Sequence, residues 1–327
     1  MGSLEVVQAL VSPAEKLIEA VSGAIGKAYE PHHICKMADA KAYELKTISD
    51  AVRNNSDVPI VYDSTGVSID TSNYEEIAKR ASSRLAYHEI SKQQNIEAVI
   101  DNAYQELQSA DPIQDKQVDS DWMFRFFNSV ENISNEDMQK IWGRILAGEI
   151  QTPSKYSYRT MEILRNITQS EAQLFQRVAS LSLRHQNTVF ILADDSLMNK
   201  YGVYFVNLLT LEECGIMSSQ SLSLTLTVSN SVNAFIWNSH VLGEVTGKTD
   251  KEEVVLTIHV FTEAGSQLID AIQPEQNEAY IKDCMELIRD NNLEKSIVKA
   301  HQINYIDNAG KINYDLTDIL PAVQSEV

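Results

Sequence analysis

The stretch that decides the fold runs from Asp121 to Leu181 and reads DWMFRFFNSVENISNEDMQKIWGRILAGEIQTPSKYSYRTMEILRNITQSEAQLFQRVASL. Ser134-x-x-Asp137 and Thr168-x-x-Glu171 predict helix starts, and Gly148 is placed to help end the helix between them. Apolar residues recur at helical spacing in two sets: Trp122, Met123, Phe126, Phe127 and Val130, then Met138, Ile141, Trp142, Ile145 and Leu146. The stretch therefore predicts three or four packed helices, and it carries no recognisable catalytic group.

The residues before this stretch predict more helix. Residues 4–53 follow helical spacing from Leu4 through Val7, Leu10 and Val11, with Pro13 suited to a first turn, and turn formers at 54–70 predict a linker or a short hairpin. Ser72-x-x-Glu75 is a capping box before a helix that can run from Tyr74 to Ala110. Its sparse apolar stripe consists of Ile77, Ala81, Leu85, Ile96, Val99, Ala103 and Leu107. A helix roughly 50 Å long is too long for one small domain, so it predicts a packing arm or an oligomer seam.

The period changes after Leu183. Strands are predicted at 188–193, 222–228, 232–237 and 254–260, and helices at 200–214, from near Glu263, and at 275–289. Gly215 is a natural left-handed helix cap, and Thr262-x-x-Gly265 leads into the next helix. This order of helix, alternating strands and turn suggests a winged-helix-like unit.

The predicted fold is mainly α, with helical N-terminal and central domains and a C-terminal α+β winged-helix-like domain. The predicted divisions are 1–53 for N-terminal amphipathic helices, 54–70 for a linker, 71–183 for the long helix and central helical domain, and 184–327 for the winged-helix-like domain.

Composition restricts the setting and the partners. The chain has 327 residues, a formal net charge of −19 and three widely spaced cysteines, which favours a reducing compartment over a disulfide framework. No secretory signal and no run of 18 apolar residues is visible, so a cytoplasmic protein is expected. An acidic surface repels phosphate backbones and anionic lipids, so binding to nucleic acid or to a membrane surface is disfavoured.

Candidate chemistry is weak. His32-His33-x-Cys35 resembles half of a zinc site, but no second pair completes it. The carboxylate pairs Asp119/Asp121, Asp194/Asp195 and Glu252/Glu253 are adjacencies expected by chance among 46 acidic residues. Phosphate-binding loops, dinucleotide-binding loops and nucleophile elbows are missing from the sequence. We therefore predict no enzyme and no catalytic, cofactor-binding or metal-binding residues. Ser22-Gly23-Ala24-Ile25-Gly26 indicates closely packed soluble helices or, as an alternative, helices that act at a membrane.

The segments EDMQKIWGRILAGEI at 136–150, P-S-x-Y-S-x-R-T-M-E-I-L at 153–164 and T-Q-S-E-A-Q-L-F at 168–175 carry a family resemblance. They resemble an uncharacterised bacterial domain-of-unknown-function family and are similar to the abortive-infection Abi-alpha proteins. AIGKAYEPHHICKMADAKA at 24–42 and the Leu-x-x-x-Gly-Ile and Thr-x-x-Gly-x-x-Leu signals at 211–268 fit the same group. The resemblance implies a bacterial or prophage-encoded cytoplasmic protein tied to phage defence, and it supplies no catalytic residues.

The leading functional expectation is a non-enzymatic interaction protein. It would self-associate as a homo-oligomer through helices at 4–53 and 74–110 and act as a sensor or effector in anti-phage defence, with a phage or host protein as a partner. The alternatives are a winged-helix DNA-binding regulator that uses residues 200–265, and a membrane-acting toxin that uses the N-terminal helices. The candidate recognition helix, KYGVYFVNLLTLEECG, has one Lys and two Glu, which disfavours contact with base edges.

Overall fold

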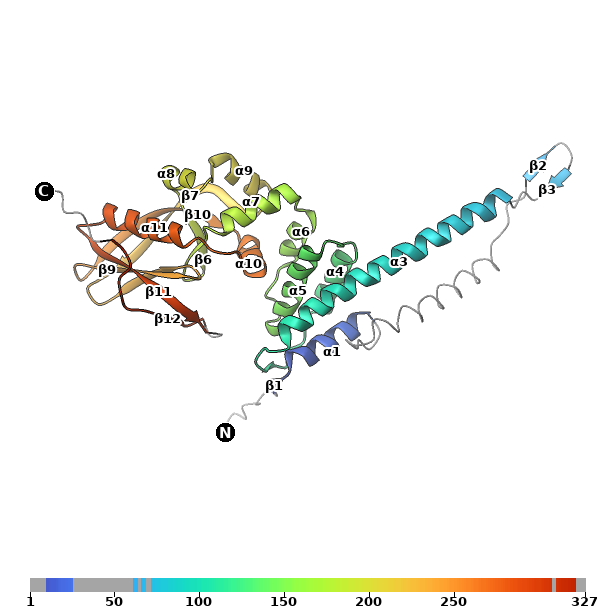
Figure 1. Ribbon diagram of the computed structural model, residues 1–327, viewed down its shortest axis with the longest axis horizontal. Coiled ribbons are helices and arrows are strands. Elements are labelled where there is room, and N and C mark those ends of the chain that lie inside the picture. Colours follow the sequence, from blue (N-terminus) through green and yellow to red (C-terminus); the bar gives the residue numbers. More distant parts are fainter. Residues whose placement is uncertain (1–9, 26–60, 64–65, 69–71, 308–309, 322–327) are drawn as a thin grey trace, which may run out of the picture. The chain divides into compact units, whose positions relative to one another are not determined.

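A computed structural model of the chain describes residues 10–25, 61–63, 66–68, 72–307 and 310–321 (Figure 1). The chain divides into two compact units, Met1–Tyr156 and Ser157–Val327. Each unit has its own buried core, so each is described separately.

Unit 1 is helical. Its elements are β1 (Leu10–Val11), α1 (Pro13–Ile25), β2 (Val61–Asp63), β3 (Gly66–Ser68), α3 (Ser72–Leu107), β4 (Ile113–Gln114), α4 (Ser120–Val130) and α5 (Glu136–Gln151). Helix α3 packs along α5, while α1 contacts α3, α4 and α5. β1 pairs with β4, and β2 pairs with β3 as a short hairpin, one of the two structures predicted for 54–70.

The core of unit 1 confirms the helical pattern of the deciding stretch. Trp122 and Phe126 are stacked with ring centroids 5.1 Å apart, and Trp142 meets Phe126 edge-on at 5.5 Å. Helices α3 and α5 approach closely because α5 has a glycine at the crossing: a Cβ at Gly143 would lie 2.6 Å from the Cβ of Asn102. The aromatic cluster joins α4 to α5, and the crossing at Gly143 joins α5 to α3, so these contacts fix the arrangement of α3, α4 and α5.

Unit 2 is an α+β unit. Its helices are α6 (Tyr158–Asn166), α7 (Gln169–Ala179), α8 (Asp195–Lys200), α9 (Phe205–Glu213), α10 (Glu263–Ile272) and α11 (Glu278–Asn291). Its strands are β5 (Leu183–His185), β6 (Thr188–Leu192), β7 (Met217–Val228), β8 (Asn233–Trp237), β9 (Val241–Gly247), β10 (Glu252–Phe261), β11 (Ser296–Ile306) and β12 (Ile312–Tyr314). They form one sheet in the order β12-β11-β9-β8-β5-β6-β10-β7, and neighbouring strands in this order pair antiparallel.

The sheet overturns the prediction of a mainly α fold. An eight-stranded antiparallel sheet makes the chain an α+β protein. The predicted winged-helix-like domain is wrong as well, because β7 and β10 are long sheet strands paired from Val228↔Glu252 to Met217↔Phe261 and not the short ribbon of a wing. Strands β9 and β11, which extend the sheet, were not predicted from the sequence, and β9 shows the physical reason. β9 reads VLGEVTG and buries residues on both faces, so it has no polar–apolar alternation to reveal it.

Several local predictions need correction too. Leu10 and Val11 form a strand and not a helix. The helix predicted over 200–214 is interrupted, since α8 ends at Lys200 and α9 begins at Phe205. Gly215 does adopt the predicted left-handed conformation, with a φ of 74°. The side chains of the Ser72-x-x-Glu75 box lie outside the described residues, although α3 starts at Ser72.

Candidate interaction surfaces

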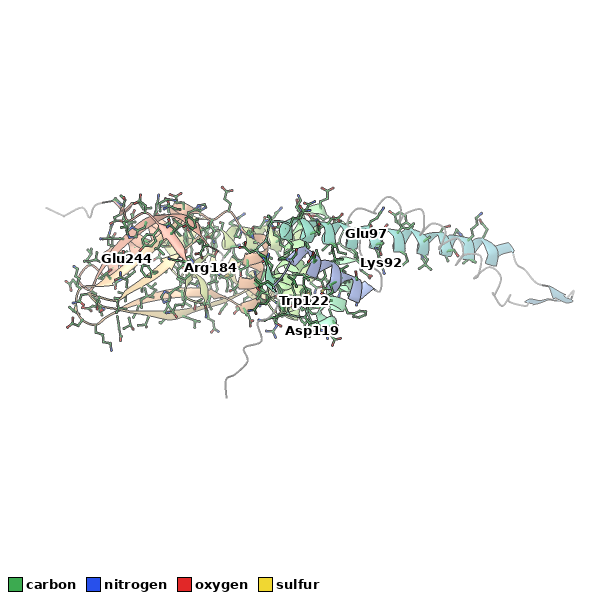
Figure 2. All side chains as sticks on the ribbon, turned by 90° about the horizontal axis from the view of Figure 1, so that it is seen from below. Lys92, Glu97, Asp119, Trp122, Arg184 and Glu244 are labelled. Carbon is green, nitrogen blue, oxygen red and sulfur yellow. The ribbon has the colours of Figure 1, made fainter. Side chains whose placement is uncertain are left out.

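The predicted carboxylate pairs serve helix starts and strand positions. The Asp119 carboxylate accepts the backbone N–H groups of Asp121 at 2.7 Å and Trp122 at 3.1 Å, at the start of α4 (Figure 2). Asp194 caps α8 in the same way through the N–H of Leu197. Glu252 accepts the hydroxyl of Thr249 beside β10. Within the described residues, no three His, Cys, Asp or Glu side chains gather as metal ligands.

The histidine and cysteine candidates do not form a site among the described residues. His32, His33 and Cys35 lie outside the described residues. Cys214 and Cys284 are free thiols, and burial raises the pKa of Cys214 to about 11 and that of Cys284 well above its usual range. Both are therefore neutral thiols at physiological pH, whereas a nucleophile needs the thiolate.

The small-residue cluster of α1 is open where the structure describes it. A Cβ at Gly23 would meet no atom within 4 Å, so this glycine is not needed for close helix packing. A hollow of about 240 Å³ lies beside it, between α1 and residues 117–123. No helix among the described residues is both long and apolar enough to cross a membrane.

Glu149 is the most deeply buried carboxylate in the described part of the chain. It lies near the end of α5, is 1% exposed, and accepts the backbone N–H groups of Ser154 at 2.6 Å and Tyr156 at 3.0 Å. The carbonyl of Tyr156 in turn accepts the Trp122 indole N–H at 2.8 Å. Glu149 thus folds the 152–156 loop back onto α5. Gly148, predicted to end the helix, instead makes room for the Tyr156 ring, which a Cβ there would strike at 2.7 Å.

Glu149→Gln is expected to destabilise unit 1. The backbone N–H groups of Ser154 and Tyr156 bond to the two oxygens of the Glu149 carboxylate, whereas a glutamine amide has one oxygen and would turn its NH₂ group toward one of these donors. Burial raises the pKa of Glu149, outweighing the N–H groups that lower it. The folded state therefore holds this proton more tightly than the unfolded chain, and the Glu149 contribution to the unfolding free energy falls as pH rises through the raised pKa. The difference in unfolding free energy between wild type and Glu149→Gln, measured by urea titration, should therefore narrow as the pH rises above the ordinary range of a glutamate. Exposed Glu76→Gln serves as the control, and a gap that widens with pH would contradict the argument.

Two further polar clusters also have structural roles. The His301 ring, 2% exposed, lies between the Glu244 carboxylate at 3.1 Å and the carbonyl of Thr317 at 3.2 Å, which fastens the 315–319 segment to β11 (Figure 2 labels Glu244). Asp283 on α11 accepts the Tyr201 hydroxyl at 2.6 Å. These contacts hold chain segments together. Candidate binding sites are therefore found on the exposed surface of the chain.

The first surface is the exposed half of α3. Val99, Ala103 and Leu107 of the apolar stripe are buried in unit 1, whereas Ile77 and Leu85 are 55% and 58% exposed. An α-helix turns by about 100° per residue, so all five positions lie on one face about 120° wide. The face that forms the core of unit 1 therefore continues along α3 as an apolar surface that the described part of the chain leaves exposed. We call Ile77, Ala81 and Leu85 the α3 face.

The second surface is formed by α9 and β7, which pack together in unit 2. On α9, the side chains of Phe205 and Val206 are 58% and 63% exposed, and those of Tyr204 and Leu209 are exposed as well. On β7, residues 220–225 are exposed except for half-buried Leu224. Cys214 to Gly243 contains no Asp, Glu, Lys or Arg, in a chain with a net charge of −19. We call the exposed part of this run, residues 220–225 of β7, the neutral surface; α9 beside it ends in the exposed Glu212 and Glu213. Its lack of charge was readable from the sequence, but its exposure was not.

Comparisons with known proteins give a family without an assigned activity. Residues 79–285 match the sequence model of a family described as "Protein of unknown function (DUF2806)". No curated protein and no solved structure gives a significant match.

Proposed function

The chain belongs to the DUF2806 family, and we propose that it is a non-enzymatic interaction protein that self-associates through the α3 face. The observation that carries the proposal is the continuity of the apolar stripe on α3. Its second half lies in the core of unit 1, and its first half exposes Ile77 and Leu85. Large apolar side chains at helical spacing on an uncovered face are typical of a surface that pairs with another helix.

A second copy of α3 is the occupant that we propose. The residues between the apolar positions include Lys79, Arg80 and Arg84 together with Glu76 and Glu89, so the helix offers both signs of charge within a strongly acidic chain. This mixed charge favours self-pairing over contact with a uniformly charged partner.

The biological role that we propose is that of a sensor or effector in bacterial anti-phage defence, with a phage or host protein as the trigger. Its support is the likeness of residues 136–175 to the Abi-alpha proteins. Assembly through α3 would convert recognition by one copy into a response by several, as multivalent effectors do.

Ile77→Lys with Leu85→Lys is expected to lower the solution mass of the full chain. Four-carbon cationic side chains in the α3 face would desolvate on pairing, which should raise the dissociation constant at least tenfold. Light scattering at micromolar concentration measures the mass against the 36.7 kDa of one chain. The matched control is Ser83→Lys with Gln94→Lys, exposed positions on the opposite side of the same helix.

A wild-type chain that is strictly monomeric at micromolar concentration would refute the assembly. So would an unchanged mass in the Ile77→Lys, Leu85→Lys variant. Phage challenge of bacteria that express wild type, this variant and its control addresses the biological role: the control should protect as wild type does, and the α3 variant should not. Equal protection by all three would separate defence from assembly.

A further inference from the structure

β7 is a long strand with one open edge. It is the last strand of the sheet, and β10 is the one strand paired with it in the described part of the chain. Beyond Val228 the chain turns toward β9, where the N–H of Gly247 donates to the carbonyl of Ser229 at 3.1 Å. The middle of β7, residues 220–225, exposes side chains on both its faces, with Leu224 half-buried. Half of this strand therefore offers an unpaired backbone row together with accessible side chains.

The open edge lacks the usual protection of edge strands. Charged side chains, proline, bulges or a covering segment normally prevent edge-to-edge pairing. β7 reads MSSQSLSLTLTV and contains no charge, no proline and no glycine. The register shift of this strand pair sets the β7 residues from Met217 to Ser221 against the shorter β10 stretch from His259 to Phe261, so the bulge lies at the start of β7 and leaves the register from Ser221 to Val228 regular. An edge of this kind is a template for a further strand.

We propose that this edge is a second self-association surface, at which β7 pairs antiparallel with β7 of another copy about a two-fold axis. The neutrality of the edge argues for this occupant. Two chains that each carry a charge of −19 repel one another over most approaches, and the uncharged run from Cys214 to Gly243 lowers that repulsion along the edge. The surface lies in unit 2, so the inference does not depend on the α3 face.

The sequence of β7 suits pairing with itself. From Ser221 to Thr227 it alternates a hydroxyl side chain with leucine, and this order reads the same in both directions about Leu224. Antiparallel pairing would set leucine opposite leucine on one face and Ser or Thr opposite Ser or Thr on the other, both of which are favourable cross-strand pairs. The exposed side chains of α9 would add apolar area beside the joined strands.

A two-fold axis between antiparallel strands places one residue directly opposite itself. That pair has Cα atoms about 4.5–5.5 Å apart, within the range of a disulfide. A residue two positions away is separated from its own copy by four residues of strand, about 13 Å, which is beyond disulfide reach. A cysteine scan of the edge therefore identifies both the pairing and its register.

The test places single cysteines at 221, 222, 223, 224 and 225 in a full chain with Cys35→Ser and Cys214→Ser. Mild oxidation should link one of these variants into a dimer at least tenfold more than the variants two positions away. Thr257→Cys is the matched control, because Thr257 is exposed and lies beside Ser223, but on the inner neighbour β10. A scan in which no position crosslinks above this control overturns the proposal.

Solution mass provides an independent measurement and separates the two surfaces. In the Ile77→Lys, Leu85→Lys background, the remaining species should be a dimer. Adding Ser223→Lys with Thr225→Lys should raise its dissociation constant at least tenfold, while Thr257→Lys should leave it unchanged. Two results would overturn the β7 proposal without affecting the α3 face. One is a monomer in the Ile77→Lys, Leu85→Lys variant, and the other is a dimer whose dissociation constant does not change when Ser223→Lys and Thr225→Lys are added. A wild-type mass that Ile77→Lys with Leu85→Lys leaves unchanged, while Ser223→Lys with Thr225→Lys lowers it to that of one chain, would refute the proposed function instead.

Discussion

Gly265→Ala should destabilise unit 2 by about 3 kcal/mol or more, because a Cβ at this position would overlap the carbonyl oxygen of Ile216. The obstacle is backbone and cannot rotate away. The N–H of Thr262 donates to the same carbonyl at 2.9 Å, and the Thr262 hydroxyl donates to the carbonyl of Gly215 at 2.7 Å. The Thr262-x-x-Gly265 turn is thus tied to the chain just before β7, and relief of the overlap would break these bonds.

Gly23→Ala is the matched control for Gly265→Ala. Both glycines lie in helices, but a Cβ at Gly23 meets open space. Removal of glycine there should stabilise α1 by about 0.5–1 kcal/mol. Urea unfolding followed through Trp237, the tryptophan of unit 2, measures the Gly265→Ala effect, while helical circular dichroism follows Gly23→Ala. Gly265→Ala at wild-type stability would show that the 215–216 turn yields and that the close approach is unimportant.

Trp142→Ala should cost unit 1 about 3–5 kcal/mol, since it removes the largest fully buried side chain from the contact with Phe126. Trp142→Phe should cost much less. The indole N–H of Trp142 is buried without a hydrogen-bond partner, so phenylalanine gives up volume but also removes an unsatisfied donor.

Trp122→Phe supplies the comparison within the same cluster. The Trp122 indole donates to the carbonyl of Tyr156 at 2.8 Å, and this bond is lost in phenylalanine. Trp122→Phe should therefore lower the unfolding free energy, measured in urea, by about 1 kcal/mol more than Trp142→Phe does, although Trp122 is the less buried of the two. The reverse order would mean that volume alone sets these costs.

Local signals explain which helices could be predicted. The apolar faces of α4 and α5 and the Thr168 capping box of α7 were predicted correctly, because spacing and capping depend on residues within a few positions of each other. The predicted cap at Ser134 was one residue early. Asn135 is the N-cap of α5, and its side chain accepts the N–H of Met138 at 3.0 Å. Asparagine and serine are about equally favourable at this position, so the sequence does not distinguish them.

Strand order explains what could not be predicted. β10 pairs with β6, which lies far earlier in the chain, and with β7 on its other side, and neither choice leaves a local trace. β7 itself was predicted from the alternation of Leu222 to Val228. Its position at the open edge follows only from the complete sheet. The α3 face is different: its apolar stripe was visible in the sequence, while the point where burial stops depends on where α5 begins against α3, near the contact of Gln139 with Asn95.

The uncharged run from Cys214 to Gly243 also has a consequence for biosynthesis. β7 leaves the ribosome before β10, its neighbour in the sheet, which is complete only at Phe261. At about 5–20 residues per second, the nascent chain carries an unpaired Ser-Leu-Thr strand for about 2–7 seconds. On a polysome many such strands are close together, and β7 would then meet the β7 of neighbouring nascent chains before its own β10 exists. Low translation density on the message, or a chaperone that binds uncharged extended segments, would limit this pairing.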